Sequence, residues 1–388
     1  MSDYTLILLD MDGVLIDSRG YREALRDTVD HFALQMGVIP PHLTEDEITH
    51  FEACGMTNEW LSGAFCLAAL LMAVADEDLA VIRLTLEETI VAVREVEPAI
   101  DRPDFSGLAA QLLDQHPEGL HHSASIAQAL EGMTPPALHR LLNEILLDVH
   151  PPNAPVACIF QNLVLGQQMF QETYGYRPML DVKSYLQSKD QPLLNRAVRM
   201  VLKQFITHEG HGAAIYTARP SLPPTLNGLS PNSYAPEAEM GSTLVGLEDF
   251  PLVGGGHMRW LSEQKGLPSD AYCKPSPVHT LAALGAAIAG DAQPAMEASI
   301  RVFEEGLLEN PFEKLRSHHT EIVIYEDGLA GIKAAREAIR LLHAAGLDAT
   351  LTCIGISGKR SKRDSLARVA DQVLPNINAA VRDLIERR

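Results

Sequence analysis

The sequence predicts an α/β protein in which helices wrap a central parallel sheet, with a large, mostly helical segment inserted near the N-terminus. Short apolar runs, each ending at a polar turn and followed by helix-like sequence, occur at 4–9, 213–217, 322–326 and 351–356. Such runs are typical of strands buried on both faces of a parallel sheet. Between Ser18 and Phe205, apolar residues instead recur at helical spacing. Alternating strands and helices place ligands at the carboxyl ends of the strands.

The composition limits the partners that the protein can bind. The chain has 388 residues, with 31 basic and 51 acidic side chains and a formal net charge of −20. Nucleic acid and anionic membrane surfaces would repel it, so we expect neither as a partner, and a small anionic ligand would need local cations. The five cysteines form no CxxC pair and the N-terminus lacks a secretory signal pattern, so we expect reduced thiols in a cytoplasmic protein. The apolar window 60–75 predicts a buried helix.

The first apolar run leads directly into two aspartates, Asp10 and Asp12. Residues two apart in an extended chain point the same way, so both carboxylates can face one cavity, while Gly13 lets the backbone turn. One carboxylate could then act as a nucleophile or metal ligand and the other as an acid and base. The same stretch also fits a strand followed by an Asx turn, in which aspartate only caps the loop. This stretch alone leaves both interpretations open.

Three later stretches carry side chains that suit phosphate chemistry. Thr217 ends the second run, with backbone amides behind it that could cradle phosphate oxygens. Lys274 precedes a proline-initiated helix, where its ammonium could hold a phosphate or reduce repulsion between aspartates. Glu326 and Asp327 end another run and offer hard oxygen ligands for Mg²⁺.

Taken in order, the four stretches resemble the four motifs of the haloacid dehalogenase superfamily, specifically its phosphatase and phosphomutase branch. Residues 10–18 resemble the signature DxDGxxxDS, and residues 213–217 resemble a hydrophobic strand ending in Thr or Ser. Lys274 followed by proline resembles the third motif, and EDGLAGIKAA at 326–335 resembles the form EDSxAGIxAA of the fourth. Many members carry a second aspartate where this chain has Gly331, and Glu326 can supply that carboxylate.

The resemblance implies a division of the chain into two domains. A Rossmann-like catalytic core would comprise residues 1–17 and 206–388, and residues 18–205 would form a helical cap that closes over the active site. The irregular stretch 220–256 and a helical stretch at 282–315 would embellish the core.

The resemblance also implies roles for the motif residues. Asp10 would attack phosphorus and become an aspartyl phosphate, while Asp12 would protonate the leaving alkoxide and then activate water. Burial under the cap would keep Asp12 protonatable near neutral pH. Thr217 and Lys274 would bind the transferring phosphoryl group. The residues implied for substrate binding are Thr217, Ala218, Arg219 and Lys274, and those for Mg²⁺ are Asp10, Asp12 through its backbone carbonyl, Glu326 and Asp327.

The expected function is a Mg²⁺-dependent phosphatase acting on a small phosphorylated metabolite. One alternative is a phosphomutase resembling β-phosphoglucomutase, which would use the same core residues but return the phosphoryl group to a bound sugar. Another is a noncatalytic binding or scaffold protein on the same fold. The sequence does not identify the substrate or the oligomeric state.

Three weaker features admit simpler interpretations. The basic patch GlyLysArgSerLysArg at 358–363 is expected to be a solvated turn on an acidic surface. The glycine-rich stretch 254–257 is expected to be a flexible loop. Cys273 adjoins Lys274, which could lower its thiol pKa, although packing explains a cysteine there equally well.

Overall fold

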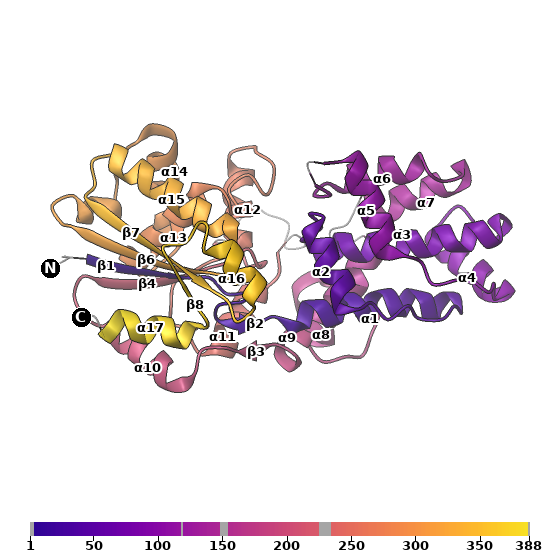
Figure 1. Ribbon diagram of the computed structural model, residues 1–388, viewed down its shortest axis with the longest axis horizontal. Coiled ribbons are helices and arrows are strands. Elements are labelled where there is room, and N and C mark those ends of the chain that lie inside the picture. The colour runs from indigo at the N-terminus through magenta and orange to yellow at the C-terminus, as the bar shows by residue number, and fades with distance from the viewer. Residues whose placement is uncertain (1–3, 118, 148–153, 225–233, 387–388) are drawn as a thin grey trace. The chain divides into compact units, whose positions relative to one another are not determined.

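The computed structural model describes residues 4–117, 119–147, 154–224 and 234–386. The chain forms two compact units. One comprises Met1–Ser18 and Asp190–Arg388, and the other comprises Arg19–Lys189. The first unit contains the sheet that the apolar runs predict, and the second is helical, as the spacing of its apolar residues indicates (Figure 1).

The sheet unit is built on six strands in the order β5-β4-β1-β6-β7-β8, with every neighbouring pair parallel. The strands are β1 (Tyr4–Leu9), β4 (His211–Tyr216), β5 (Leu252–Val253), β6 (Thr320–Glu326), β7 (Ala349–Ile356) and β8 (Gln372–Leu374). Leu9, at the end of β1, lies opposite Ile215 of β4 and Tyr325 of β6. The carboxyl ends of these three strands therefore meet at one edge of the sheet.

Helices cover both faces of the sheet, which explains why its strands are apolar at nearly every position. In β1, Leu6 and Leu8 point into one buried core, while Ile7 and Leu9 point into the other. Figure 1 shows α13, α14 and α15 over one face and α10 and α17 over the other. The α/β class with a parallel central sheet and a large helical part is thus confirmed. The helices of this unit are α10 (Arg196–Phe205), α11 (Glu237–Val245), α12 (Gly255–Gln264), α13 (Pro277–Ala289), α14 (Gln293–Glu305), α15 (Leu329–Ala344), α16 (Arg360–Leu366) and α17 (Ile377–Glu386).

The helical insertion ends earlier than the sequence led us to expect. Residues 190–205 fall within the sheet unit rather than the helical one. The strand β3 (Gln191–Pro192) pairs antiparallel with β2 (Ile16–Asp17), and α10 buries Val198 and Leu202 in the same core as Leu9. Helical spacing predicted α10 itself, but spacing does not tell against which core a helix packs.

The two stretches expected to embellish the core are integral to it in their described parts. Stretch 220–256 contributes α11 and β5, which is a strand of the central sheet, and residues 225–233 lie outside the described residues. Stretch 282–315 contains most of α13, in which Ala282, Ala283 and Ala286 are fully buried, and α14, which packs on α13. Small alanine side chains allow α13 to lie close to the strands, so this helix forms part of the sheet unit's core.

The helical unit is organised around α3, which contacts α1, α7 and α8. By length and composition α3 could cross a membrane, but 72% of its apolar window is buried inside the protein. It is therefore a buried core helix, as the window 60–75 predicted. The elements of this unit are α1 (Arg19–Met36), α2 (Glu45–Ala53), α3 (Glu59–Glu77), the 3-10 helix η1 (Leu79–Val81), α4 (Leu86–Val96), α5 (Phe105–Gln115), α6 (Ser123–Glu131), α7 (Pro136–Leu146), α8 (Pro155–Tyr174) and α9 (Tyr185–Ser188).

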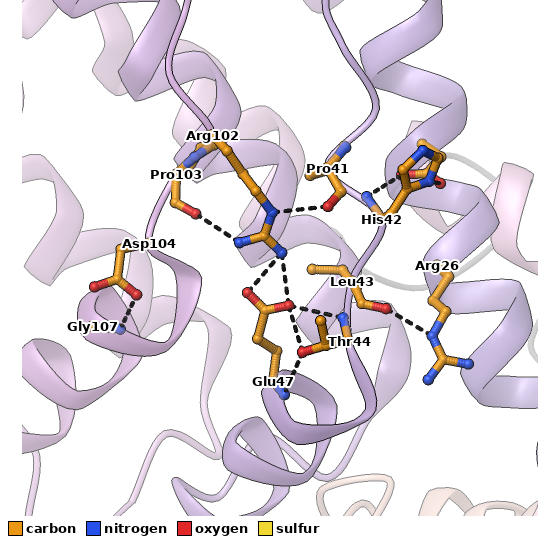
Figure 2. A network of polar contacts seen from close by, with 11 residues as sticks. Arg26, Pro41, His42, Leu43, Thr44, Glu47, Arg102, Pro103, Asp104 and Gly107 are labelled. Atoms are coloured by element: carbon orange, nitrogen blue, oxygen red, sulfur yellow. Dashed lines mark hydrogen bonds and ion pairs between the residues drawn. The ribbon is translucent and has the colours of Figure 1, made fainter.

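A polar network fixes the loop between α1 and α2 of this unit (Figure 2). Arg102 donates one hydrogen bond to the Pro41 carbonyl at 2.8 Å and two more to the carboxylate of Glu47 at 2.7 and 2.8 Å. Glu47 and Thr44 in turn form a capping box at the start of α2. Since the Arg102 side chain is 43% exposed, the ion pair itself contributes only about 0–1 kcal/mol. Its main effect is to hold the loop in one conformation.

Candidate active site

The acidic residues that follow β1 and end β6 lie together at the carboxyl edge of the sheet. Asp10 comes directly after β1, and its backbone N–H donates to the carbonyl of Tyr325 at 3.0 Å, which continues the strand pairing by one residue. Glu326 is the last residue of β6 and Asp327 follows it. Carboxylate oxygens of Asp10, Glu326 and Asp327 all lie within 4.8 Å of one another. Register between parallel strands therefore builds this carboxylate cluster.

Lys274 joins the cluster from a distant part of the chain. Its ammonium donates to Asp10 Oδ1 at 2.8 Å, to Glu326 Oε1 at 2.7 Å and to the carbonyl of Tyr216 at 3.1 Å. These three acceptors satisfy all three N–H groups of the ammonium. The nitrogen also lies 3.7 Å from the centroid of the Tyr216 ring, within the range of a cation–π contact. The charge of Lys274 is thus fixed in position against two carboxylates.

Two glycines make room for the carboxylates. A Cβ atom added at Gly331 would overlap the carboxylate of Glu326, since even Oε2 would be only 2.6 Å away. At Gly13, where φ is +73°, an added Cβ would lie 2.6 Å from Asp327 Cγ. Gly331 is the position at which many members of the resembled family carry a second aspartate. In this chain the Glu326 side chain occupies the space beside that position.

Burial and mutual repulsion shift the pKa values in the cluster. Burial and the neighbouring Asp10 raise the pKa of Glu326 to about 7, against the opposing effect of Lys274. Burial raises the pKa of Asp327 to about 6, where the ammonium of Lys362 acts against the shift and Asp10 adds to it. Burial would lower the pKa of Lys274, but Asp10 and Glu326 raise it above its usual value. When ionised, the three carboxylates of the cluster carry more charge than the ammonium groups of Lys274 and Lys362 neutralise, so the cluster favours a further cation.

Asp12 lies in a different environment from the cluster. Its carboxylate accepts hydrogen bonds from Arg219, with Nη2 at 2.6 Å and Nε at 2.9 Å from Oδ1, and from the hydroxyl of Ser18. Burial would raise the pKa of Asp12, but the charge and hydrogen bonds of Arg219 outweigh this and lower it below the usual value. We expected burial to keep Asp12 protonatable near neutral pH. In this structure Arg219 instead favours the ionised form.

The turn after β4 holds the other three residues expected at the substrate site. Thr217 is fully buried and its Oγ1 accepts a hydrogen bond from the backbone N–H of Arg219 at 3.1 Å. The Arg219 guanidinium is also buried and contacts Asp190 Oδ2 at 3.0 Å as well as Asp12. The Ala218 carbonyl lies close to Gly255, at the start of α12. A role in substrate binding stays a prediction for all three residues.

Two of the weaker sequence features differ from expectation. Cys273 is expected to have either a lowered pKa or a packing role, and burial raises its pKa to about 11, which favours packing. Stretch 254–257 is the start of α12 rather than a flexible loop. His257 Nδ1 accepts a hydrogen bond from the backbone N–H of Gly254 at 3.2 Å and lies 3.0 Å from Ser221 Oγ. The backbone of Ser221 and Arg219 lies so close to the three glycines at 254–256 that a Cβ atom there would overlap it or its neighbours. This close approach explains why the stretch is rich in glycine.

Sequence reasoning missed three residues near the site. Tyr216 lies within the apolar run 213–217 without an expected role, Asp190 lies outside every motif, and Lys362 belongs to the patch expected to be a solvated turn. Lys362 forms an ion pair with Asp327. The position of Lys362 could have been predicted from the sequence. The patch follows the apolar run 351–356 and so lies at the carboxyl end of a strand, where the other site residues lie.

Comparison with known proteins supports the fold but not an activity. No protein-family model matches this sequence, and no curated protein sequence matches it. An X-ray structure solved as a target of the Northeast Structural Genomics Consortium is 16% identical, with a TM-score of 0.64 over 100% of both chains. A phosphatase from Thermococcus thioreducens is 14% identical, with a TM-score of 0.45 over 98% of this chain and 99% of that one. The first likeness indicates a shared fold, and the second is too weak to support an argument.

Proposed function

We propose that the protein is a Mg²⁺-dependent phosphatase of the haloacid dehalogenase superfamily, which hydrolyses a small phosphorylated metabolite through an aspartyl phosphate on Asp10. One observation carries the proposal. Asp10, Lys274, Glu326 and Asp327 come from the stretches that resemble the first, third and fourth motifs of that family, and their side chains meet at one edge of the sheet. Lys274 and Asp10 are 264 residues apart in sequence, so local sequence pattern does not account for their contact.

The carboxylate cluster fits a magnesium ion. Its ligand atoms are hard oxygens, which Mg²⁺ prefers, and those of Asp10, Glu326 and Asp327 are mutually within 4.8 Å. Burial, with a further contribution from Asp10, raises the pKa of Glu326 and of Asp327 although a lysine lies beside each of them, so a bound cation would favour the ionised form of both carboxylates. When bound, Mg²⁺ would neutralise these charges and polarise the phosphoryl group.

In the first step Asp10 is the nucleophile. Lys274 holds Asp10 Oδ1 at 2.8 Å and so restricts rotation of the carboxylate, which leaves Oδ2 to attack phosphorus. The P–O bond to the leaving alkoxide breaks as the new bond to Oδ2 forms. The ammonium of Lys274 also stabilises the negative charge on the equatorial oxygens.

Asp12 is the acid and base of the proposed reaction. In the second step it accepts a proton from the water that attacks the aspartyl phosphate, and the ionised form favoured by Arg219 suits this task. In the first step Asp12 must donate a proton to the leaving alkoxide, so the contact with Arg219 has to weaken when substrate binds. Arg219 thus sets the balance between the two protonation states.

The test is Mg²⁺-dependent release of inorganic phosphate from an aryl phosphate and from a panel of sugar phosphates, phosphoglycolate and nucleotides. Wild-type protein should release phosphate with at least one of them, and Asp10→Asn should reduce the rate at least about a thousandfold, as expected when a nucleophile is lost. The fold of the variant is checked by circular dichroism. Isomerised sugar phosphate without free phosphate would favour a phosphomutase, and no reaction with any compound would favour a noncatalytic protein.

A further inference from the structure

The basic patch at 358–363 lies beside the carboxylate cluster. It covers the turn after β7 and the first residues of α16, and β7 pairs with β6 up to Glu326 and Gly355. From α16 the ammonium of Lys362 reaches the carboxylate of Asp327, with which it forms an ion pair. The patch therefore lies at the same edge of the sheet as the candidate active site, and it is not a remote solvated turn.

The charges of the patch are largely unbalanced. Among the described residues, no carboxylate forms an ion pair with Lys359, Arg360 or Arg363. Other arginines, such as Arg301 and Arg340, form ion pairs with glutamates on their own helices. In a chain with a net charge of −20, four cations within five positions form a local region of opposite sign. Such a region attracts anions to the site and raises their local concentration.

Among the residues that the structure describes, Lys362 has one ion-pair partner, Asp327. Asp327 belongs to the carboxylate cluster that fits a divalent cation. A cation bound to Asp327 would compete with the Lys362 ammonium for the same carboxylate oxygens. The Lys362 side chain is 43% exposed, so it can move away from Asp327 without leaving a buried charge unpaired.

We propose that Lys359, Arg360, Lys362 and Arg363 form an anion-binding subsite at the edge of the active site. Lys362 is the member nearest the reacting phosphoryl group. The substrate is accordingly a small molecule that carries a second anionic group, a phosphate or a carboxylate, in addition to the phosphoryl group that is transferred. This inference rests on the proposed function and narrows its substrate class.

The experiment compares ligands that differ only in the second anionic group. One pair is fructose 1,6-bisphosphate and fructose 6-phosphate, and the other is 3-phosphoglycerate and glycerol 3-phosphate, which has a hydroxymethyl group in place of the carboxylate. Dissociation constants are measured by calorimetry with Mg²⁺ in an Asp10→Asn background, so that binding is observed without turnover. The variants are Lys362→Met, which keeps the length of the side chain, Lys362→Arg, which keeps its charge, and the control Arg368→Ala, beyond the end of α16.

In at least one pair, the ligand with the second anionic group should bind about tenfold more tightly to the Asp10→Asn protein, as expected for one charge-assisted hydrogen bond. Lys362→Met should reduce this preference to less than about twofold, because it should weaken binding of the ligand with the second anionic group more than binding of the ligand without that group. Lys362→Arg and Arg368→Ala should retain the preference. The pair that shows it identifies the second group as phosphate or carboxylate.

Two results would overturn the inference: no preference in either pair, or a preference that survives Lys362→Met. Failure of the proposed function would be seen differently. Protein with Asp10 intact would then release no phosphate from any of the four ligands, whatever their relative affinities.

Discussion

Gly331 provides a test of the site's packing that does not depend on activity. In the middle of a helix, replacing glycine by alanine normally stabilises a protein by about 1 kcal/mol. Gly331 is the third residue of α15, so the gain there is at most this large, and an added Cβ would overlap the carboxylate of Glu326. To avoid the overlap, Glu326 would have to leave the position from which it contacts Lys274 at 2.7 Å. The two effects oppose each other, and their magnitudes decide which one dominates.

Breaking a buried ion pair costs about 3–5 kcal/mol when one charge is left without a partner. Lys274 keeps Asp10 as a partner, so the lower end of that range applies, and the helix gain offsets at most about 1 kcal/mol of it. Gly331→Ala should therefore destabilise the wild-type protein by roughly 2–3 kcal/mol. In a Glu326→Ala background the overlap is absent, and the same substitution should stabilise the protein by up to about 1 kcal/mol.

The assay is urea denaturation of the four proteins in this double-mutant cycle. The chain has two tryptophans, Trp60 in the helical unit and Trp260 in the sheet unit. In a Trp60→Phe background, tryptophan fluorescence reports on the sheet unit alone. The prediction is a change of sign for Gly331→Ala between the two backgrounds, with a coupling energy of about 3 kcal/mol. Equal destabilisation in both backgrounds would refute the packing of Glu326 against Gly331.

Three further predictions follow from the same geometry. Gly13→Ala should lower the rate of phosphate release at least about tenfold, because φ is +73° and the new methyl group would displace Asp327. Arg219→Gln should raise the pKa of Asp12, the acid of the first step, so the alkaline limb of the pH profile of kcat/KM should move to higher pH; an unmoved limb would show that Arg219 does not set this pKa. Burial lowers the pKa of His257 to about 4, so as pH falls the imidazole is protonated in the unfolded chain before it is protonated in the folded protein. The free energy of unfolding should therefore decrease between about pH 6.5 and 4, by on the order of 3 kcal/mol from this group. His257→Asn keeps an acceptor near Nδ1 without a titrating group, and its urea midpoint should vary less with pH over that range, whereas an identical pH dependence would exclude His257 as a source.

The sheet and the carboxylate cluster could be predicted from the sequence because both depend on local patterns. Apolar runs that end in polar residues mark the carboxyl ends of parallel strands, and those ends lie together in any such sheet. Asp10, Glu326 and Asp327 therefore had to lie at the same edge of the sheet once the runs were recognised as strands, but their contact also requires that β1 pairs directly with β6, which the pattern does not specify. Lys274 required more, because it follows no strand, and only the resemblance to a known motif indicated its position.

The environment of Asp12 could not be predicted in the same way. Its pKa is lowered by Arg219, whose guanidinium also contacts Asp190, and nothing in the stretch around Asp12 indicates either partner. Long-range ion pairs of this kind depend on the path of the turn after β4. The assignment of residues 190–205 to the sheet unit was missed for a similar reason, since an amphipathic helix has the same pattern whichever core it faces.

The central claim is that Asp10 carries the phosphoryl group during the reaction, and trapping that species tests it most directly. Protein turning over a substrate identified by phosphate release is quenched in acid, digested, and analysed by mass spectrometry for the peptide that contains Asp10. The account predicts a phosphoryl group on Asp10 during turnover, none without substrate, and none in Asp10→Asn. Sustained phosphate release with an unmodified Asp10 peptide, at a rate that Asp10→Asn leaves unchanged, would contradict it.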